Sequence, residues 1–108
     1  MGDIWRVLGA AGDAVGDIVI DEADFPWLHG RFVPGPGFAT VEPLFQRELE
    51  LLERYDEDET AGEEWEAVHS DIGRAVSLMS PTGPVAEFLL HIQGDRAWFR
   101  WSDEPFAE

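Results

Sequence analysis

The middle of the chain carries apolar residues at the spacing of an amphipathic helix. Thr40 is a suitable N-cap, and Pro43 would fall in the first turn, where its missing N–H costs little. The pattern predicts a helix over about 41–55 with one apolar stripe and one charged face. The stripe consists of Val41, Leu44, Phe45, Leu49, Leu52 and Tyr55.

A second helix is predicted after the acidic loop 56–59. Thr60 and Glu63 have the spacing of a capping box, in which each side chain bonds the other residue's backbone N–H. This helix is expected to stop near Gly73. Its apolar stripe would contain Trp65, Val68, His69 and Ile72.

Runs rich in β-forming residues precede the helices. Residues 4–8 and 15–20 are predicted to pair as two strands, with Gly12-Asp13 in the turn between them. A third strand is expected over 24–33, and Pro26 places it at a sheet edge because proline cannot donate to a ladder. The run Pro34-Gly35-Pro36-Gly37 would end it.

The last third of the chain has the clearest alternation. Strands are predicted over 76–80, 85–93 and 96–102, with Gly94-Asp95 as a two-residue hairpin turn. Pairing Gln93 with Arg96 fixes the register of this hairpin. The expected core face is Phe88, Leu90, Ile92, Ala97, Phe99 and Trp101, and the opposite face pairs His91 with Trp98 and Leu89 with Arg100.

The turn at 81–84 leaves two registers for the strand before it. A four-residue loop would bury Ala75, Ser77 and Met79, whereas an odd loop with a bulge would bury Val76 and Leu78. We favour the bulge because it buries the larger side chains.

These elements predict one α+β domain over residues 1–108. Their order is β-β-β-α-α-β-β-β, an antiparallel sheet with the two helices packed on one face. A hydrophobic content of 44% in 108 residues supports a single core. No internal repeat is present, and no motif is specific enough to indicate a family.

The net charge of the chain limits the kinds of partner that it can bind. The chain has 23 acidic against 7 basic residues, all arginine, for a formal charge of −16. Such a surface repels nucleic acid and anionic membranes, so we expect a basic partner. Half of the acidic residues form a block that is either a solvated helix face with an acidic loop or an electronegative docking patch: Glu42, Glu48, Glu50, Glu53, Asp56, Glu57, Asp58, Glu59, Glu63, Glu64 and Glu66.

Sequence motifs for catalysis or metal binding are missing. The chain has no cysteine and no lysine, which removes thiolate sites and phosphate loops of the Gly-Lys type. An EF-hand starting at Asp56 would have Ala61 in place of glycine and Ala67 in place of glutamate. His29, His69 and His91 could form a metal site with some of the carboxylates, but their spacing is uninformative, and we expect neither metal nor cofactor. With no apolar run for a secretion signal or a membrane span, the cytoplasm is the expected location.

Five tryptophans are the second unusual count. Trp65 and Trp101 are assigned to packing. Trp5, Trp27 and Trp98 either cover the second face of the sheet or line an aromatic recognition surface.

The resulting hypothesis is a non-catalytic acidic module that binds a basic protein, in the manner of inhibitor, immunity or antitoxin proteins. A small-molecule-binding domain or enzyme that uses the aromatic and histidine surface is the first alternative, and a homo-oligomer with a sheet-face interface is the second. No catalytic, cofactor or metal residue is assigned. The candidate partner-binding residues are Glu53, Asp56, Glu57, Asp58, Glu59, Glu63, Glu64, Trp27, His29, His91, Trp98 and Arg100.

Overall fold

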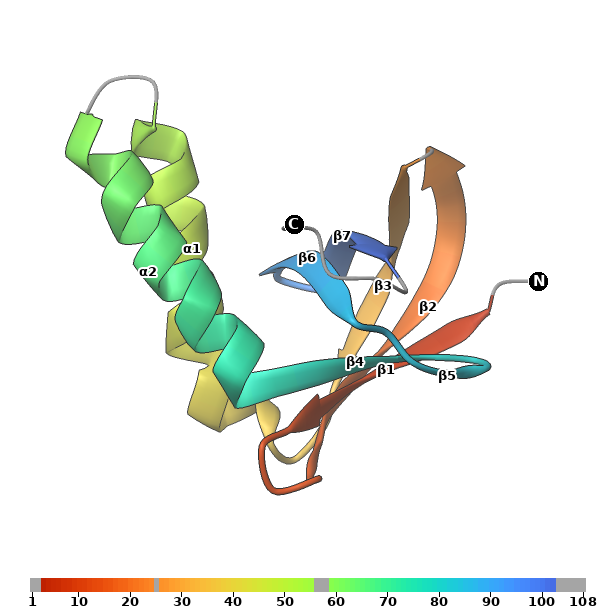
Figure 1. The fold of residues 1–108 in the computed structure, drawn as a ribbon. Helices are drawn as coiled ribbons and strands as arrows, with labels where there is room; N and C mark the ends of the chain where they lie inside the picture. Colours follow the sequence, from red (N-terminus) through yellow and green to blue (C-terminus); the bar gives the residue numbers. More distant parts are fainter. Residues whose placement is uncertain (1–2, 25, 56–58, 103–108) are drawn as a thin grey trace.

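The computed structural model describes residues 3–24, 26–55 and 59–102, shown in Figure 1. Within these ranges the strands form one antiparallel sheet in the spatial order β5-β4-β1-β2-β3-β7-β6. The predicted α+β fold and its element order are confirmed. The elements are β1 (Ile4–Gly9), β2 (Ala14–Asp24), β3 (Trp27–Pro34), α1 (Phe38–Arg54), α2 (Glu59–Ala75), β4 (Val76–Ser80), β5 (Gly83–Pro84), β6 (Glu87–Gln93) and β7 (Arg96–Ser102).

The sheet curls around its inner face, and the two helices lie side by side along one flank of it (Figure 1). α1 contacts β6 and β2, while α2 contacts α1 and β4. We call α1 and α2 together the helical pair. The core lies between the curled sheet and the helical pair, and its buried cluster is Trp5, Val7, Val15, Ile18, Phe32, Val41, Phe45, Ile72, Val76, Leu78, Leu90, Ile92, Ala97 and Phe99.

Both helices begin earlier than predicted. Gly37, not Thr40, is the N-cap of α1, because the backbone N–H of Gly37 donates to the Ala14 carbonyl and ties the loop to β2. The Phe38 ring then packs against Phe32 with a centroid separation of 4.9 Å. Tertiary contacts therefore set the start of this helix, and Pro43 falls beyond its first turn.

The limits of α2 lie one residue before the predicted start at Thr60 and two residues after Gly73. The helix begins at Glu59, so Thr60 lies inside the first turn and is not the N-cap of a capping box. Gly73 has no positive φ and does not terminate the helix, which continues to Ala75 and runs directly into β4. The buried side chains of Ile72 and Val76 on either side of this junction explain the continuity.

β3 lies inside the sheet, not at its edge as predicted. It pairs with β2 on one side and with β7 on the other. Pro26 precedes the strand, so its missing N–H does not interrupt either ladder. The free edge next to β7 is β6 instead.

The β6–β7 hairpin has the predicted register, with Gln93 opposite Arg96 and His91 opposite Trp98. Gly94 has φ +61 and no described non-glycine residue has a positive φ, which is the pattern of a type II′ turn. One core assignment was wrong: Trp101 is 37% exposed and packs on Trp5 near the open end of the curled sheet.

The segment after α2 divides where the sequence predicted one long strand from 85. Ser80 pairs with Gly83 around Pro81-Thr82, and the two-residue β5 ends before β6 begins. Val76 and Leu78 are buried as predicted, but β4 pairs with β1 and β5 rather than with β6.

Candidate functional site

A buried carboxylate and a buried imidazole meet where α1 lies against β6. Glu48 is 1% exposed and His91 is 4% exposed. The Nδ1 atom of His91 lies 2.9 Å from Glu48 Oε1. An ionised carboxylate only accepts hydrogen bonds, so Nδ1 is the donor when Glu48 is ionised.

Trp65 of α2 occupies the second oxygen of the same carboxylate. Its Nε1–H donates to Glu48 Oε2 over 2.5 Å. The indole also stacks on His69, one helical turn further on, with ring centroids 5.0 Å apart. Glu48 thus joins α1, α2 and β6 through two hydrogen bonds, which satisfies the buried charge and fixes both rings.

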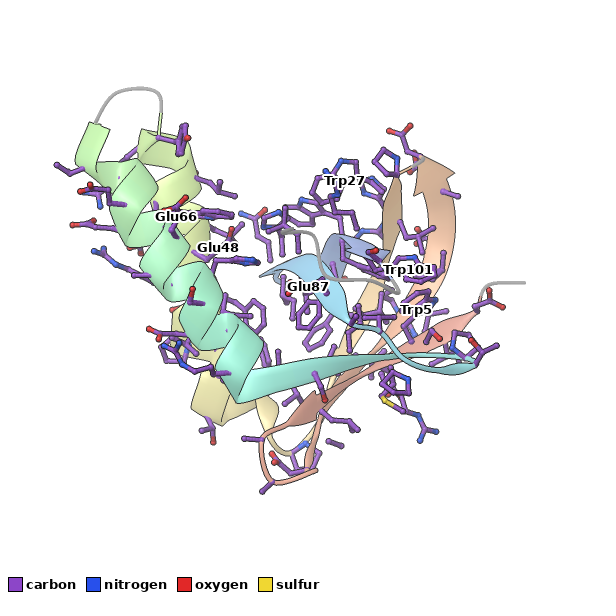
Figure 2. The ribbon with its side chains drawn as sticks, viewed as in Figure 1. Trp5, Trp27, Glu48, Glu66, Glu87 and Trp101 are labelled. Carbon is purple, nitrogen blue, oxygen red and sulfur yellow. The ribbon has the colours of Figure 1, made fainter. Side chains whose placement is uncertain are left out.

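Two tryptophans from the sheet flank His91. Trp27 of β3 stacks on His91 with ring centroids 5.7 Å apart, and the ring centroid of Trp98 on β7 lies 5.3 Å from that of His91. His29 lies opposite Trp98 in the β3–β7 ladder. Figure 2 shows Glu48 on the helical side and Trp27 on the strand side of this region. The sheet topology therefore brings His29, Trp98 and His91 into one row across three strands.

An open hollow of about 450 Å³ lies between the helical pair and these strands. It adjoins a second hollow of about 610 Å³, because Trp65 and Leu89 line both. We call the two together the helix–sheet groove. Its first part is lined by Trp27, Leu52, Tyr55, Trp65, Leu89 and His91, and its second part by Trp65, Glu66, His69, Ser70, Leu89 and Arg100.

His91 also lines this groove. Among the described residues, the hydrogen bond of its ring is the one at Nδ1, and none of them pairs with Nε2.

A larger hollow, about 680 Å³, lies around Trp5 and Trp101, and it shares Trp27 and Arg100 with the groove. It includes Asp3, Pro26 and Ser102, which all border residues outside the described ranges. The helix–sheet groove differs from this hollow because the buried Glu48–His91 pair lies in its wall.

The predicted site residues separate into two groups. Trp27, His29, His91 and Trp98 lie together on one face of β3, β7 and β6, the face opposite the buried Leu90 and Phe99, and Arg100 follows on β7. The acids lie on the helical pair, where Glu53, Glu63 and Glu64 are exposed. Asp56, Glu57 and Asp58 lie outside the described residues, and only the backbone of Glu59, at the start of α2, is described.

Sequence reasoning missed three residues at the site: Glu48, Tyr55 and Trp65. Glu48 was counted among the solvated acids, yet it lies three residues after Phe45 and four before Leu52, which places it on the apolar stripe of α1. An acid on such a stripe needs a buried partner. That signal was available, although the identity of the partner was not.

The three histidines have separate environments. His91 is held by Glu48, His69 stacks on Trp65 and His29 sits in the middle of the sheet. Among the described residues no group of three or more His, Cys, Asp or Glu side chains is arranged to hold a metal ion. Neither α1 nor α2 is long and apolar enough to cross a membrane.

Comparison of the chain with protein-family models, with curated proteins and with solved structures gives no match.

Proposed function

We propose that the protein is a non-catalytic binding module that recruits a basic protein through its helical pair and the helix–sheet groove. The observation that carries the proposal is the position of the groove: an aromatic hollow opens beside a helical surface that is densely acidic. A basic partner would meet both features at once, the acids at long range and the aromatic rings on contact.

The acids of the helical pair are only partly neutralised. Arg47 lies 3.4 Å from Glu64 and 3.8 Å from Glu50, and Arg54 lies 3.7 Å from Glu64. Both arginines thus act on the same small set of carboxylates. Three exposed acids of the helical pair form no ion pair with a described residue: Glu53, Glu63 and Glu66.

This surface supports fast, salt-sensitive association. The screening length falls from about 30 Å at ~0.01 M salt to about 8 Å at ~0.15 M. Charges on the rim of an interface act mainly on the association rate. The acids would therefore guide a basic partner to the groove rather than determine how long it stays.

The experiment is stopped-flow association with a lysine-rich peptide at several salt concentrations. We expect the rate to fall steeply with salt, and to fall several-fold at low salt when Glu53, Glu63 and Glu66 are replaced together by glutamine. A matched control replaces three exposed acids elsewhere on the protein, namely Asp3→Asn, Glu22→Gln and Asp24→Asn. Rates that ignore salt, or that fall equally in both triple variants, would contradict the proposal.

A second candidate function is favoured by the Glu48–His91 pair. An imidazole held at one nitrogen by a carboxylate and open at the other is the arrangement of a general base or of a small-molecule contact. In that case a small neutral molecule would occupy the groove. A thermal-shift screen of uncharged metabolite-sized compounds tests this, and a stabilisation that disappears in His91→Phe would favour it over the protein-binding function.

A further inference from the structure

We propose that the first part of the helix–sheet groove binds the side chain of an arginine that projects from the basic partner. This inference rests on the proposed function and adds to it the chemical group that is recognised. The guanidinium would lie among the aromatic rings of Trp27, Tyr55 and Trp65 and donate a hydrogen bond to His91 Nε2.

The lining of this part of the groove suits a flat cation. Three of its six lining residues carry large aromatic rings. Trp27 is the first residue of β3, Tyr55 is the C-cap of α1 and Trp65 lies on α2. Aromatic faces attract cations, and tryptophan does so most strongly. Leu52 and Leu89 complete an apolar wall that would exclude water from the contact.

His91 Nε2 is one of the polar atoms of this part of the groove, and it accepts a hydrogen bond when the imidazole is neutral. His91 Nε2 is unpaired among the described residues, and its ring is otherwise buried and fixed by Glu48. A guanidinium N–H satisfies it. A quaternary ammonium has no N–H to donate, and a lysine ammonium is a strongly hydrated point charge that stacks less well than guanidinium. The chemistry therefore favours arginine.

The local charges favour a cation at this end of the groove. Glu48 lies directly behind the imidazole, with its Oε1 atom 2.9 Å from Nδ1. Arg100 lines the second part of the groove, with Glu66, and is not part of the first. An arginine entering beside Tyr55 is thus attracted by the carboxylate. Arg100 is the cross-strand neighbour of Leu89 and lines only the second part of the groove.

Tyr55 offers a clean way to test the groove. Its side chain is 55% exposed, so the fold does not depend on burying it. The ring lies against Gly62 of α2, where an added Cβ would come within 3.2 Å of it. Tyr55→Ala removes one face of the binding site, whereas Tyr55→Phe retains the ring and serves as the matched control.

The experiment compares two probes by fluorescence titration of the full chain. One is a lysine-rich peptide with a single central arginine, and the other is the same peptide with citrulline, which has the same shape without the charge. We expect the arginine peptide to bind about tenfold more tightly, the size of one cation–π contact in a desolvated site. Tyr55→Ala should remove most of this difference, and Tyr55→Phe should retain it.

The outcomes separate the inference from the function on which it rests. Equal, salt-dependent binding of both peptides would overturn the arginine site and leave the acidic binding module standing. Failure of both peptides to bind at low salt would overturn both. A difference between the peptides that persists in Tyr55→Ala would show that arginine is recognised elsewhere, which also overturns the assignment to the groove.

Discussion

Glu48 of α1 and His91 of β6 share a hydrogen bond of 2.9 Å although both are almost fully buried. The pair crosses from the helical pair to the edge strand of the sheet, and Trp65 adds a second donor to the same carboxylate. It therefore holds the two walls of the helix–sheet groove together. Glu48 therefore contributes to the stability of the fold and also fixes the walls of the proposed binding site.

Removal of either partner should be costly. We expect Glu48→Ala and His91→Ala each to lower the free energy of unfolding by about 3–5 kcal/mol, because each leaves a buried polar group without its partner. The double variant should cost less than the sum of the two, with a coupling of about 1–3 kcal/mol. Urea melts of the four proteins measure this cycle, and strictly additive losses would show that the pair is not energetically coupled.

Two glycines should respond to alanine in opposite directions. A Cβ on Gly30, in the interior strand β3, would lie 2.4 Å from the Val19 carbonyl oxygen. Gly30→Ala should therefore cost more than about 2 kcal/mol through backbone displacement.

Gly73 of α2 is the comparison site for Gly30, because it lies in a helix where an added side chain has room. A Cβ there meets no described atom within 4 Å, and its φ is not positive. Gly73→Ala should raise stability by about 0.5–1 kcal/mol, because alanine loses less backbone entropy in a helix. Thermal melts of both variants check the pair, and a stabilised Gly30→Ala would show that β2 and β3 are not packed as described.

The aromatic residues Phe99 and Trp101 of β7 should differ in their contribution to the free energy of unfolding. Phe99 is fully buried and contacts Trp5, whereas Trp101 is 37% exposed. We expect Phe99→Ala to cost about 3–5 kcal/mol and Trp101→Ala less than about 2 kcal/mol. Urea melts decide this order, and equal losses would indicate that Trp101 is covered in solution.

Asp21 of β2 should titrate below its usual range. Hydrogen bonds of 2.6 and 3.0 Å from the Arg96 guanidinium lower the pKa of this carboxyl. A carboxyl with a lowered folded-state pKa stabilises the fold above its unfolded pKa, and the contribution disappears as the pH falls through the folded value. Arg96→Gln should therefore raise the Asp21 pKa, which carboxyl NMR titration measures. An unchanged titration would mean that the ion pair does not form in solution.

The local parts of the fold follow from sequence. The register of the β6–β7 hairpin could be predicted to the residue because a two-residue turn at Gly94 sets which residues face each other. The place of β3 could not, since its pairing with β7 joins segments far apart in the chain. The start of α1 failed for the same reason, because the contact between Gly37 and Ala14 sets it.

The candidate site was only half predictable. The outward face with His91 and Trp98 follows from strand alternation. The groove does not, because it needs Tyr55 and Trp65 brought over that face by the helical pair. Glu48 was recognisable as an acid on an apolar stripe, but its partner lies 43 residues away.

The most direct measurement is a ¹H–¹⁵N NMR titration of the full chain with the lysine-rich peptide that carries one arginine. Binding in the helix–sheet groove predicts that the indole N–H signals of Trp27 and Trp65 shift, together with backbone amides over 52–55 and 89–91. The indole signals of Trp5 and Trp101, which do not line the groove, should stay in place. Shifts confined to Trp5 and Trp101, or shifts only in exposed acids with none in the groove, would contradict it.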